Sequence, residues 1–290
     1  MTRSKSSSDE RPSDSAGAKI RLLVVEAPER SVLLVEGVSD EKFWCRFVER
    51  RLCRIVRADS KKTLLMTMAN LVDIVRRNVL AIADLDLDWL DSSHDPQTDV
   101  VFTDTRDLES LLVRYVGVRE LLKVLGNHNE VDTWEEKSPG CSLEARLLEM
   151  GMFLGKLRWI LQNRHGHPPP LQLQRWMSRD GWSLDLEGMS AWVAEQLSLD
   201  QVTLNGLLDA LPSAEPLLWC RGHDLCSLIG AALRGIFRSE GGKSRGEEDV
   251  QSHLMVQFKF DHLKQTTLYG GIRRWEVSHS PLCVLDPKLS

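Results

Sequence analysis

The sequence predicts an α/β protein with a parallel-sheet core near the N-terminus and an additional α-helical domain after it. From residue 19 to about 130, short runs rich in Val and Leu alternate with helix-like segments. This alternation is typical of a parallel sheet that helices cover on both faces. From about residue 131 to 290, apolar residues recur mostly at helical spacing, which indicates a mainly helical domain.

Each element of the core is predicted from a local pattern. The strands are short apolar runs bounded by turn residues, and the helices have apolar residues on one face. The helix after the second strand begins with Asp40 and Glu41, and acids in a first turn suit the helix dipole. The expected strands are 20–25, 31–36, 53–58, 78–86 and 99–104, and the expected helices are 39–52, 63–77 and 108–126.

Domain boundaries follow from the same patterns. Residues 1–18 are rich in Ser and charge and lack an apolar run, so they are expected to form a disordered tail. Residues 19–130 form the expected catalytic core. Residues 131–290 form the expected helical domain, which would contact partners or substrate and includes a long helix at 142–162.

Composition narrows the class of protein. Apolar residues make up 42% of the 290 residues, as in ordinary globular proteins. No apolar run approaches a membrane span, and the N-terminus lacks the apolar region of a secretory signal. The six cysteines are scattered without a CxxC pair, so free thiols in the cytoplasm are expected.

Charge is unevenly placed, although the net charge of −5 gives no overall attraction for nucleic acid. Residues 151–179 contain no acid and interleave basic residues with Trp159 and Trp176. This stretch is the first candidate for nucleic-acid contact, through Arg164, Arg175 and Arg179. The alternatives are that Trp159 belongs to the core, and that the basic stretch 46–62 contacts the substrate instead.

Carboxylates follow two of the predicted strands. Glu36 ends one strand, and Asp84, Asp86 and Asp88 end another. In parallel α/β sheets, ligands bind beyond the carboxyl ends of the strands. Carboxylate oxygens suit Mg²⁺, with Mn²⁺ as a second possibility, and such a site serves phosphodiester chemistry. The alternative is that these acids only cap helices and form turns.

Two further groups of polar residues stand apart from these strand ends. Asp107 and Glu109 follow the strand at 99–104, and both could simply be acids of the next helix's first turn. Cys220, His223 and Cys226 have the spacing of zinc ligands, but no second pair completes a zinc site. Core cysteines beside a helix start are the favoured interpretation.

The motifs "VEGVSD", "DLDLD", "TDTRDLE" and "RGHDLC" occur in this order between residues 32 and 226. They resemble the Toprim domain of topoisomerases, DnaG-type primases and OLD-family nucleases, in which a Glu follows the first strand and Asp-x-Asp follows the third. The resemblance is greatest to a branch in bacterial defence loci, which includes the nuclease effector of the PARIS anti-phage system. Leu87 departs from this branch, where Phe is usual.

The resemblance implies a Rossmann-like Toprim core and assigns roles to its residues. Glu36 would act as general base or metal ligand, Asp84 and Asp86 would bind Mg²⁺, and Asp88 would be a further ligand or support. The remaining motif positions, whose roles are open, are Asp40, Asp107, Glu109, His223 and Asp224. For Asp224, the alternative is a cap on a helix that starts near Leu225.

The resemblance also implies a function. It predicts a metal-dependent nuclease effector that an ABC-type ATPase partner restrains, and that cleaves tRNA or other RNA, as a homodimer, when released. The first alternative is an OLD-like DNA nuclease. The second is a catalytically inactive Toprim fold that serves as an assembly module, against which the intact Glu36, Asp84 and Asp86 argue.

Overall fold

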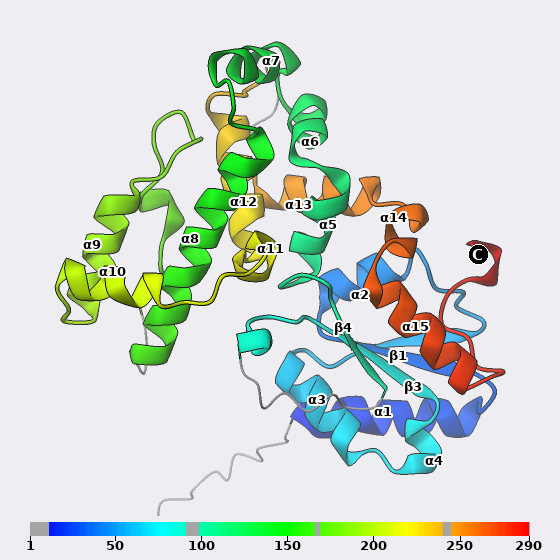
Figure 1. The fold of residues 1–290 in the computed structure, drawn as a ribbon. Coiled ribbons are helices and arrows are strands. Elements are labelled where there is room, and N and C mark those ends of the chain that lie inside the picture. The colour runs from blue at the N-terminus through cyan, green and yellow to red at the C-terminus, as the bar shows by residue number, and fades with distance from the viewer. Residues whose placement is uncertain (1–11, 91–98, 166–168, 240–244, 290) are drawn as a thin grey trace, which may run out of the picture. The chain divides into compact units, whose positions relative to one another are not determined.

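The computed structural model describes residues 12–90, 99–165, 169–239 and 245–289 (Figure 1). The chain forms two compact units, each of which is described by itself. The sheet unit contains Met1–Leu85, Ser92–Asp104 and Phe260–Ser290. The helical unit contains Asp86–Asp91 and Thr105–Lys259.

The sheet unit is built on a four-stranded parallel sheet in the order β2-β1-β3-β4. This confirms the α/β class with a parallel sheet. The central strands β1 and β3 are buried along their whole length, as expected for strands covered on both faces. In their register, Val35 at the end of β1 pairs with Ile82 of β3. The strands are β1 (Ser31–Val35), β2 (Cys53–Arg57), β3 (Val79–Ala83) and β4 (Val100–Phe102).

Helices cover the two faces of this sheet. Alternate strand residues such as Val32 and Leu34 share one apolar cluster with Ile20 of α1 and Leu64 of α3. Figure 1 shows α1, α3 and α4 on this side of the sheet and α15 on the other. The helices of the unit are α1 (Pro12–Glu26), α2 (Val38–Trp44), α3 (Lys61–Asn70), α4 (Asp73–Arg76), α14 (Phe260–Lys264) and α15 (Thr267–Ser278).

The expectations for the N-terminus were wrong in two respects. Residues 20–25 form part of helix α1 and are not a strand, and α1 begins at Pro12, inside the expected disordered tail. The buried residues Ala16, Ile20 and Val24 recur every fourth position, which places them on one face of a helix. Residues 1–11 of that tail lie outside the described residues.

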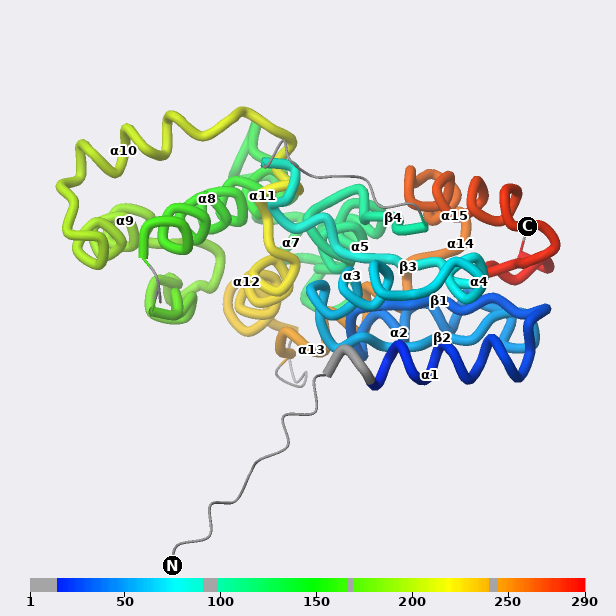
Figure 2. Tube along the Cα trace, turned by 90° about the horizontal axis from the view of Figure 1, so that it is seen from below, coloured from blue at the N-terminus to red at the C-terminus, as the bar shows by residue number. Residues whose placement is uncertain are grey.

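The helical unit packs around α12 (Gly222–Arg234), which contacts α5, α6, α8 and α13. The longest helix, α8 (Leu143–Arg164), matches the prediction of a long helix at 142–162. Figure 2 shows α9 and α10 side by side. The other helices are α5 (Leu108–Val116), α6 (Val118–Leu125), α7 (His128–Lys137), α9 (Leu186–Gln196), α10 (Gln201–Asp209), α11 (Pro216–Trp219) and α13 (Glu247–Gln257).

The division of the chain differs from the expected boundary at residue 130. Residues 105–130 belong to the helical unit, and Phe260–Ser290 belongs to the sheet unit. The chain returns to the sheet because α15 packs on β4: a Cβ at Gly271 would lie 2.6 Å from Val101. Such a close approach of helix and strand requires glycine, and it ties the C-terminal segment to the sheet.

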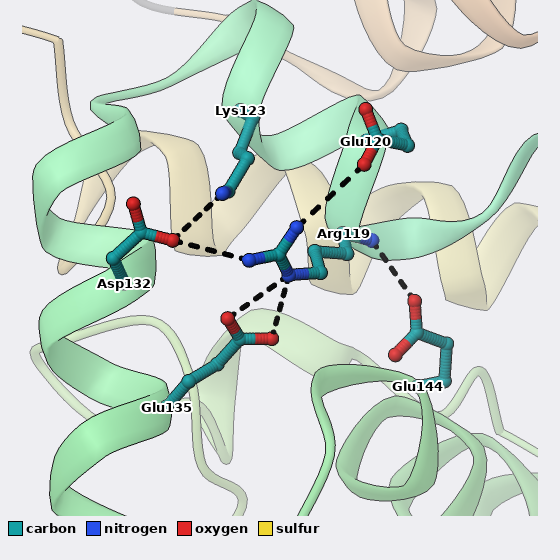
Figure 3. Close-up of polar contacts among 6 residues, drawn as sticks. All are labelled: Arg119, Glu120, Lys123, Asp132, Glu135 and Glu144. Carbon is teal, nitrogen blue, oxygen red and sulfur yellow. Dashed lines mark hydrogen bonds and ion pairs between the residues drawn. The ribbon is translucent and has the colours of Figure 1, made fainter.

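A network of ion pairs joins α6 to α7 and α8 (Figure 3). Arg119 bonds Glu135 at 2.9 Å and Asp132 at 3.2 Å, and Lys123 approaches the same Asp132 at 2.7 Å. The backbone N–H of Arg119 donates to Glu144 at 3.0 Å. The hydrogen bond from Lys123 lowers the pKa of Asp132. These side chains are partly exposed, so the network orients helices and adds little stability.

Within the described residues, no helix is both long and apolar enough to cross a membrane. All six cysteines are free thiols, as the sequence predicted.

Candidate active site

Two neighbouring strands deliver carboxylates to the same edge of the sheet. Glu36 follows directly after β1, and Asp84 follows directly after β3. Because β1 and β3 are parallel partners in register, both residues stand at the carboxyl ends of the strands. Each is partly exposed, although the strands before them are buried. The sequence-based expectation that Glu36 and Asp84 share one sheet edge is therefore confirmed.

A hydrogen bond links the two strand ends. The backbone N–H of Asp84 donates to Oε1 of Glu36 over 2.9 Å. This bond orients the Glu36 carboxylate toward β3. The next residue is also held in place: the N–H of Leu85 donates to Oγ1 of Thr103 over 2.9 Å.

Lys61 lies at the same edge, and the sequence reasoning did not single it out. It is the first residue of α3, which Ser60 caps, and it lies four residues after the end of β2. Its Nζ donates to the carbonyl oxygen of Leu85 over 3.1 Å. The available signal was the topology, because the segment that follows the parallel strand β2 begins at the same edge of the sheet. Lys61 brings a positive charge beside the acidic strand ends.

Asp40 has a structural role in its own helix. Its Oδ2 accepts a hydrogen bond from the N–H of Gly37 over 3.0 Å, which closes the first turn of α2. The helix begins at Val38 and ends at Trp44, so it is shorter than the expected 39–52. Asp40 thus fixes the chain direction immediately after Glu36.

Asp86 and Asp88 belong to the helical unit. Asp86 has a φ of 55°, a left-handed conformation that is uncommon for residues other than glycine. Its N–H donates to the carbonyl oxygen of Arg106 over 2.6 Å, which holds this conformation. Asp88 begins a short 3-10 helix, Asp88–Leu90, and is partly exposed. A strained conformation of this kind supports a functional hypothesis for Asp86.

The candidate ligands fit a metal of the Mg²⁺ type by their chemistry. Glu36, Asp84, Asp86 and Asp88 offer only carboxylate oxygens, the hard donors that Mg²⁺ takes. Among the residues that the structure describes, no three acidic, histidine or cysteine side chains are gathered into a ready metal cluster. The convergence of Glu36, Asp84 and Asp86 on one metal stays a prediction.

Asp107 and Glu109 belong to a buried polar network in the helical unit. Asp107 caps α5 by accepting from the N–H of Ser110 at 2.9 Å, and its other oxygen accepts from the N–H of Gly222 at 2.8 Å. Glu109 accepts a hydrogen bond from Gln251. Burial, together with the Asp107 carboxylate, raises the pKa of Glu109. This network joins α5 to α12 and α13, which is a structural role for both acids.

His223 and Asp224 lie in the first turn of α12. His223 is exposed and its Nδ1 lies 2.7 Å from Glu247. Asp224 is buried and forms two hydrogen bonds of 2.8 Å with Arg158 of α8. The predicted cap on a helix near Leu225 was wrong, because α12 begins at Gly222 and places Asp224 inside its first turn.

The cysteines of the C-x2-H-x2-C run support the structural interpretation. Cys220 and Cys226 are buried free thiols. Burial raises the pKa of both thiols above the usual range. His223, between them, is turned to Glu247.

The predicted nucleic-acid contacts Arg164, Arg175 and Arg179 are exposed residues of the helical unit. Arg164 ends α8, and the guanidinium of Arg175 lies 4.8 Å from the ring centre of Trp176. Trp159 is partly buried on α8. Their exposure is compatible with phosphate contact, which stays a prediction.

No protein-family model matches the chain, and a search of curated proteins finds no matching relative.

Proposed function

We propose that the protein is a metal-dependent Toprim-type nuclease that hydrolyses phosphodiester bonds. The observation that carries the proposal is the hydrogen-bonded pair of strand ends, in which the N–H of Asp84 donates to Glu36. Buried strands of a parallel sheet thus end in acids at the edge where such sheets bind ligands. The ordered motifs described above support the same assignment.

In this proposal each acid has a separate task. Asp84 and Asp86 hold the metal with Asp88 in support, and Glu36 takes the proton of the attacking water. The hydrogen bond from Asp84 orients the Glu36 carboxylate, which as a base would accept the proton of the water. A bound Mg²⁺ would supply activation of the water and neutralise charge on the phosphate. Lys61 adds a positive charge at the same edge.

We propose that the protein is a cytoplasmic effector of phage defence, which an ABC-type ATPase restrains. When released, it would act as a homodimer on tRNA or other RNA. A nuclease that attacks host RNA must be restrained in uninfected cells, which is the reason to expect the partner. Co-expression followed by size-exclusion chromatography tests it. Co-elution with the ATPase is expected, and separate elution would contradict the partnership.

The activity itself is tested by incubating the purified chain with tRNA and with plasmid DNA. Each substrate is tested with Mg²⁺, with Mn²⁺ and with EDTA. We expect metal-dependent cleavage of tRNA that EDTA abolishes. Cleavage of plasmid DNA alone would favour the OLD-like DNA nuclease. Cleavage of neither substrate, by a folded chain that binds Mg²⁺, would favour the inactive assembly module.

A further inference from the structure

A pocket in the helical unit is lined by three arginines. Its volume is about 440 Å³, within the range of roughly 300–1,000 Å³ that ligand pockets occupy. The positive residues come from three elements: the segment before α5, the middle of α8 and the residue before α12. The residues of the pocket that matter here are Arg106, Arg158, Arg221, Leu161, Gln162 and Leu171.

The protein holds two of these guanidinium groups in fixed positions. Arg158 uses Nε and Nη2 for its two bonds to Asp224. Arg106 is only 9% exposed, and its Nη1 donates to the carbonyl oxygen of Trp219 over 2.6 Å. Arg158 Nη2 also donates to the carbonyl oxygen of Leu171 over 3.4 Å. A guanidinium carries five N–H donors, so these bonds use only part of the donors of each residue. The site is therefore oriented before a ligand arrives.

Arg221 differs from the other two. It is exposed, and among the described residues its side chain makes no hydrogen bond or ion pair. It is also the residue directly before α12, whose second residue is His223. The Glu247 carboxylate interacts with the charge of Arg221, but no ion pair or hydrogen bond ties the Arg221 guanidinium. An anion can therefore bind it without first displacing a bonded partner.

Positive charge exceeds negative charge in this pocket. Of the three guanidinium groups, only that of Arg158 forms an ion pair with a described carboxylate, Asp224. Burial lowers the pKa of Arg106, and the carboxylates of Asp107, Asp86 and Asp224 oppose that effect. Gathering like charges is unfavourable, so an anion in the pocket would remove an electrostatic cost that the protein otherwise bears.

We propose that this pocket binds a phosphate group of a nucleic-acid strand. The identity of the strand as the substrate rests on the proposed function. Arginine forks match phosphate oxygens in bidentate geometry. Leu161 and Leu171 give an apolar wall for a sugar or base, and the exposed rim at Gln162 leaves the pocket open for a continuing strand.

The test is binding of a fluorescent single-stranded RNA oligonucleotide to the full chain, measured by anisotropy. All variants carry Glu36→Ala, so that binding is measured without cleavage. Arg221→Glu reverses the charge of the unpaired arginine, and Arg221→Ala removes it. The matched control is Arg238→Glu, because Arg238 is also an exposed arginine of the helical unit but does not line the pocket. Circular dichroism verifies the fold of each variant.

We expect Arg221→Glu to weaken RNA binding about ten-fold, and Arg221→Ala to lower the salt slope of binding by about one phosphate contact. Arg238→Glu should change the affinity less than about two-fold. Equal losses in Arg221→Glu and Arg238→Glu would overturn the proposal, because general charge would then explain them. Adenosine monophosphate that binds tightly without being displaced by the RNA would also overturn it, in favour of a free-nucleotide site.

The outcome separates this proposal from the proposed nuclease. A chain that cleaves RNA, and whose binding is unchanged by Arg221→Glu, refutes the pocket and leaves the nuclease intact. A chain that binds RNA through Arg221 and cleaves nothing refutes the nuclease and leaves the pocket intact.

Discussion

Replacing Asp224 with alanine removes the carboxylate that pairs with Arg158 between α12 and α8. The Asp224 side chain is 7% exposed and that of Arg158 is 21% exposed. Both of its oxygens accept hydrogen bonds of 2.8 Å from the guanidinium. The substitution therefore leaves a largely buried arginine without its counter-charge, next to Arg106 and Arg221 in the same pocket.

The magnitude follows from that geometry. Breaking one partner of a buried ion pair costs roughly 3–5 kcal/mol. The partial exposure of Arg158 lets water screen its charge, so we take the lower end, about 3 kcal/mol. For a protein of this size, each kcal/mol shifts the melting temperature by about 2–4 °C. Asp224→Ala should therefore melt about 6–12 °C below the wild type.

The assay is scanning calorimetry of the full chain, which compares Asp224→Ala, Arg158→Met and the double variant that carries both substitutions. The double variant replaces both charges with apolar groups, so it should be more stable than Asp224→Ala. A shift of less than about 3 °C in Asp224→Ala would refute the reasoning. The reasoning would also be refuted if the double variant lost as much free energy of unfolding as the two single variants together, because the two side chains would then be uncoupled.

Two further predictions concern stability. Gly155→Ala should destabilise the protein by about 1–3 kcal/mol, because its Cβ would lie 2.0 Å from the carbonyl oxygen of Trp219. Gly206→Ala should stabilise the protein by about 0.5–1 kcal/mol, because nothing lies near its Cβ. Equal melting temperatures of the two variants would contradict this contrast. Because the folded-state pKa of Glu109 is raised, ionising it costs stability as pH rises above its unfolded value. Glu109→Gln should thus raise the melting temperature at about pH 7.5 and lose that advantage toward about pH 4.5, and an advantage that is independent of pH would refute the assignment.

The parallel sheet and its acidic edge were predictable because both depend on local patterns. Strand β3 is a continuous apolar run of five residues, and β1 has four apolar residues after Ser31. An acid directly after such a run must leave the sheet at its carboxyl end. Once the strands were known to be parallel, the neighbourhood of Glu36 and Asp84 followed. No long-range information was needed for this part of the site.

The helix α1 was missed because a short apolar run is ambiguous. Residues 20–25 are all apolar except Arg21. In so short a run, the spacing of apolar residues does not distinguish a buried strand from a helix. The structure shows the distinction in exposure: Ile20 and Val24 are buried, whereas Leu22 and Val25 are 68% and 78% exposed. The fourth-residue spacing of Ala16, Ile20 and Val24 was the signal that could have found the helix.

The arginine pocket and the return of α15 to the sheet depend on contacts between distant residues. Arg106, Arg158 and Arg221 are far apart in the sequence, and only the packing of α5, α8 and α12 brings them to one pocket. Likewise, Gly271 packs closely against Val101, which is far from it in the sequence. A single sequence contains no local pattern for such pairs, so these features required the structure.

The most direct test of the central claim is the rate of RNA cleavage by Glu36→Gln with Mg²⁺. Glutamine keeps an oxygen that can accept the N–H of Asp84, so the strand ends should stay linked while the base and its charge are lost. The matched control is Glu29→Gln, because Glu29 is an exposed glutamate of the same unit. We predict that Glu36→Gln lowers the rate by about 10²-fold or more at an unchanged melting temperature, and that Glu29→Gln cleaves normally. Cleavage by Glu36→Gln at the wild-type rate would contradict the proposed function of this site.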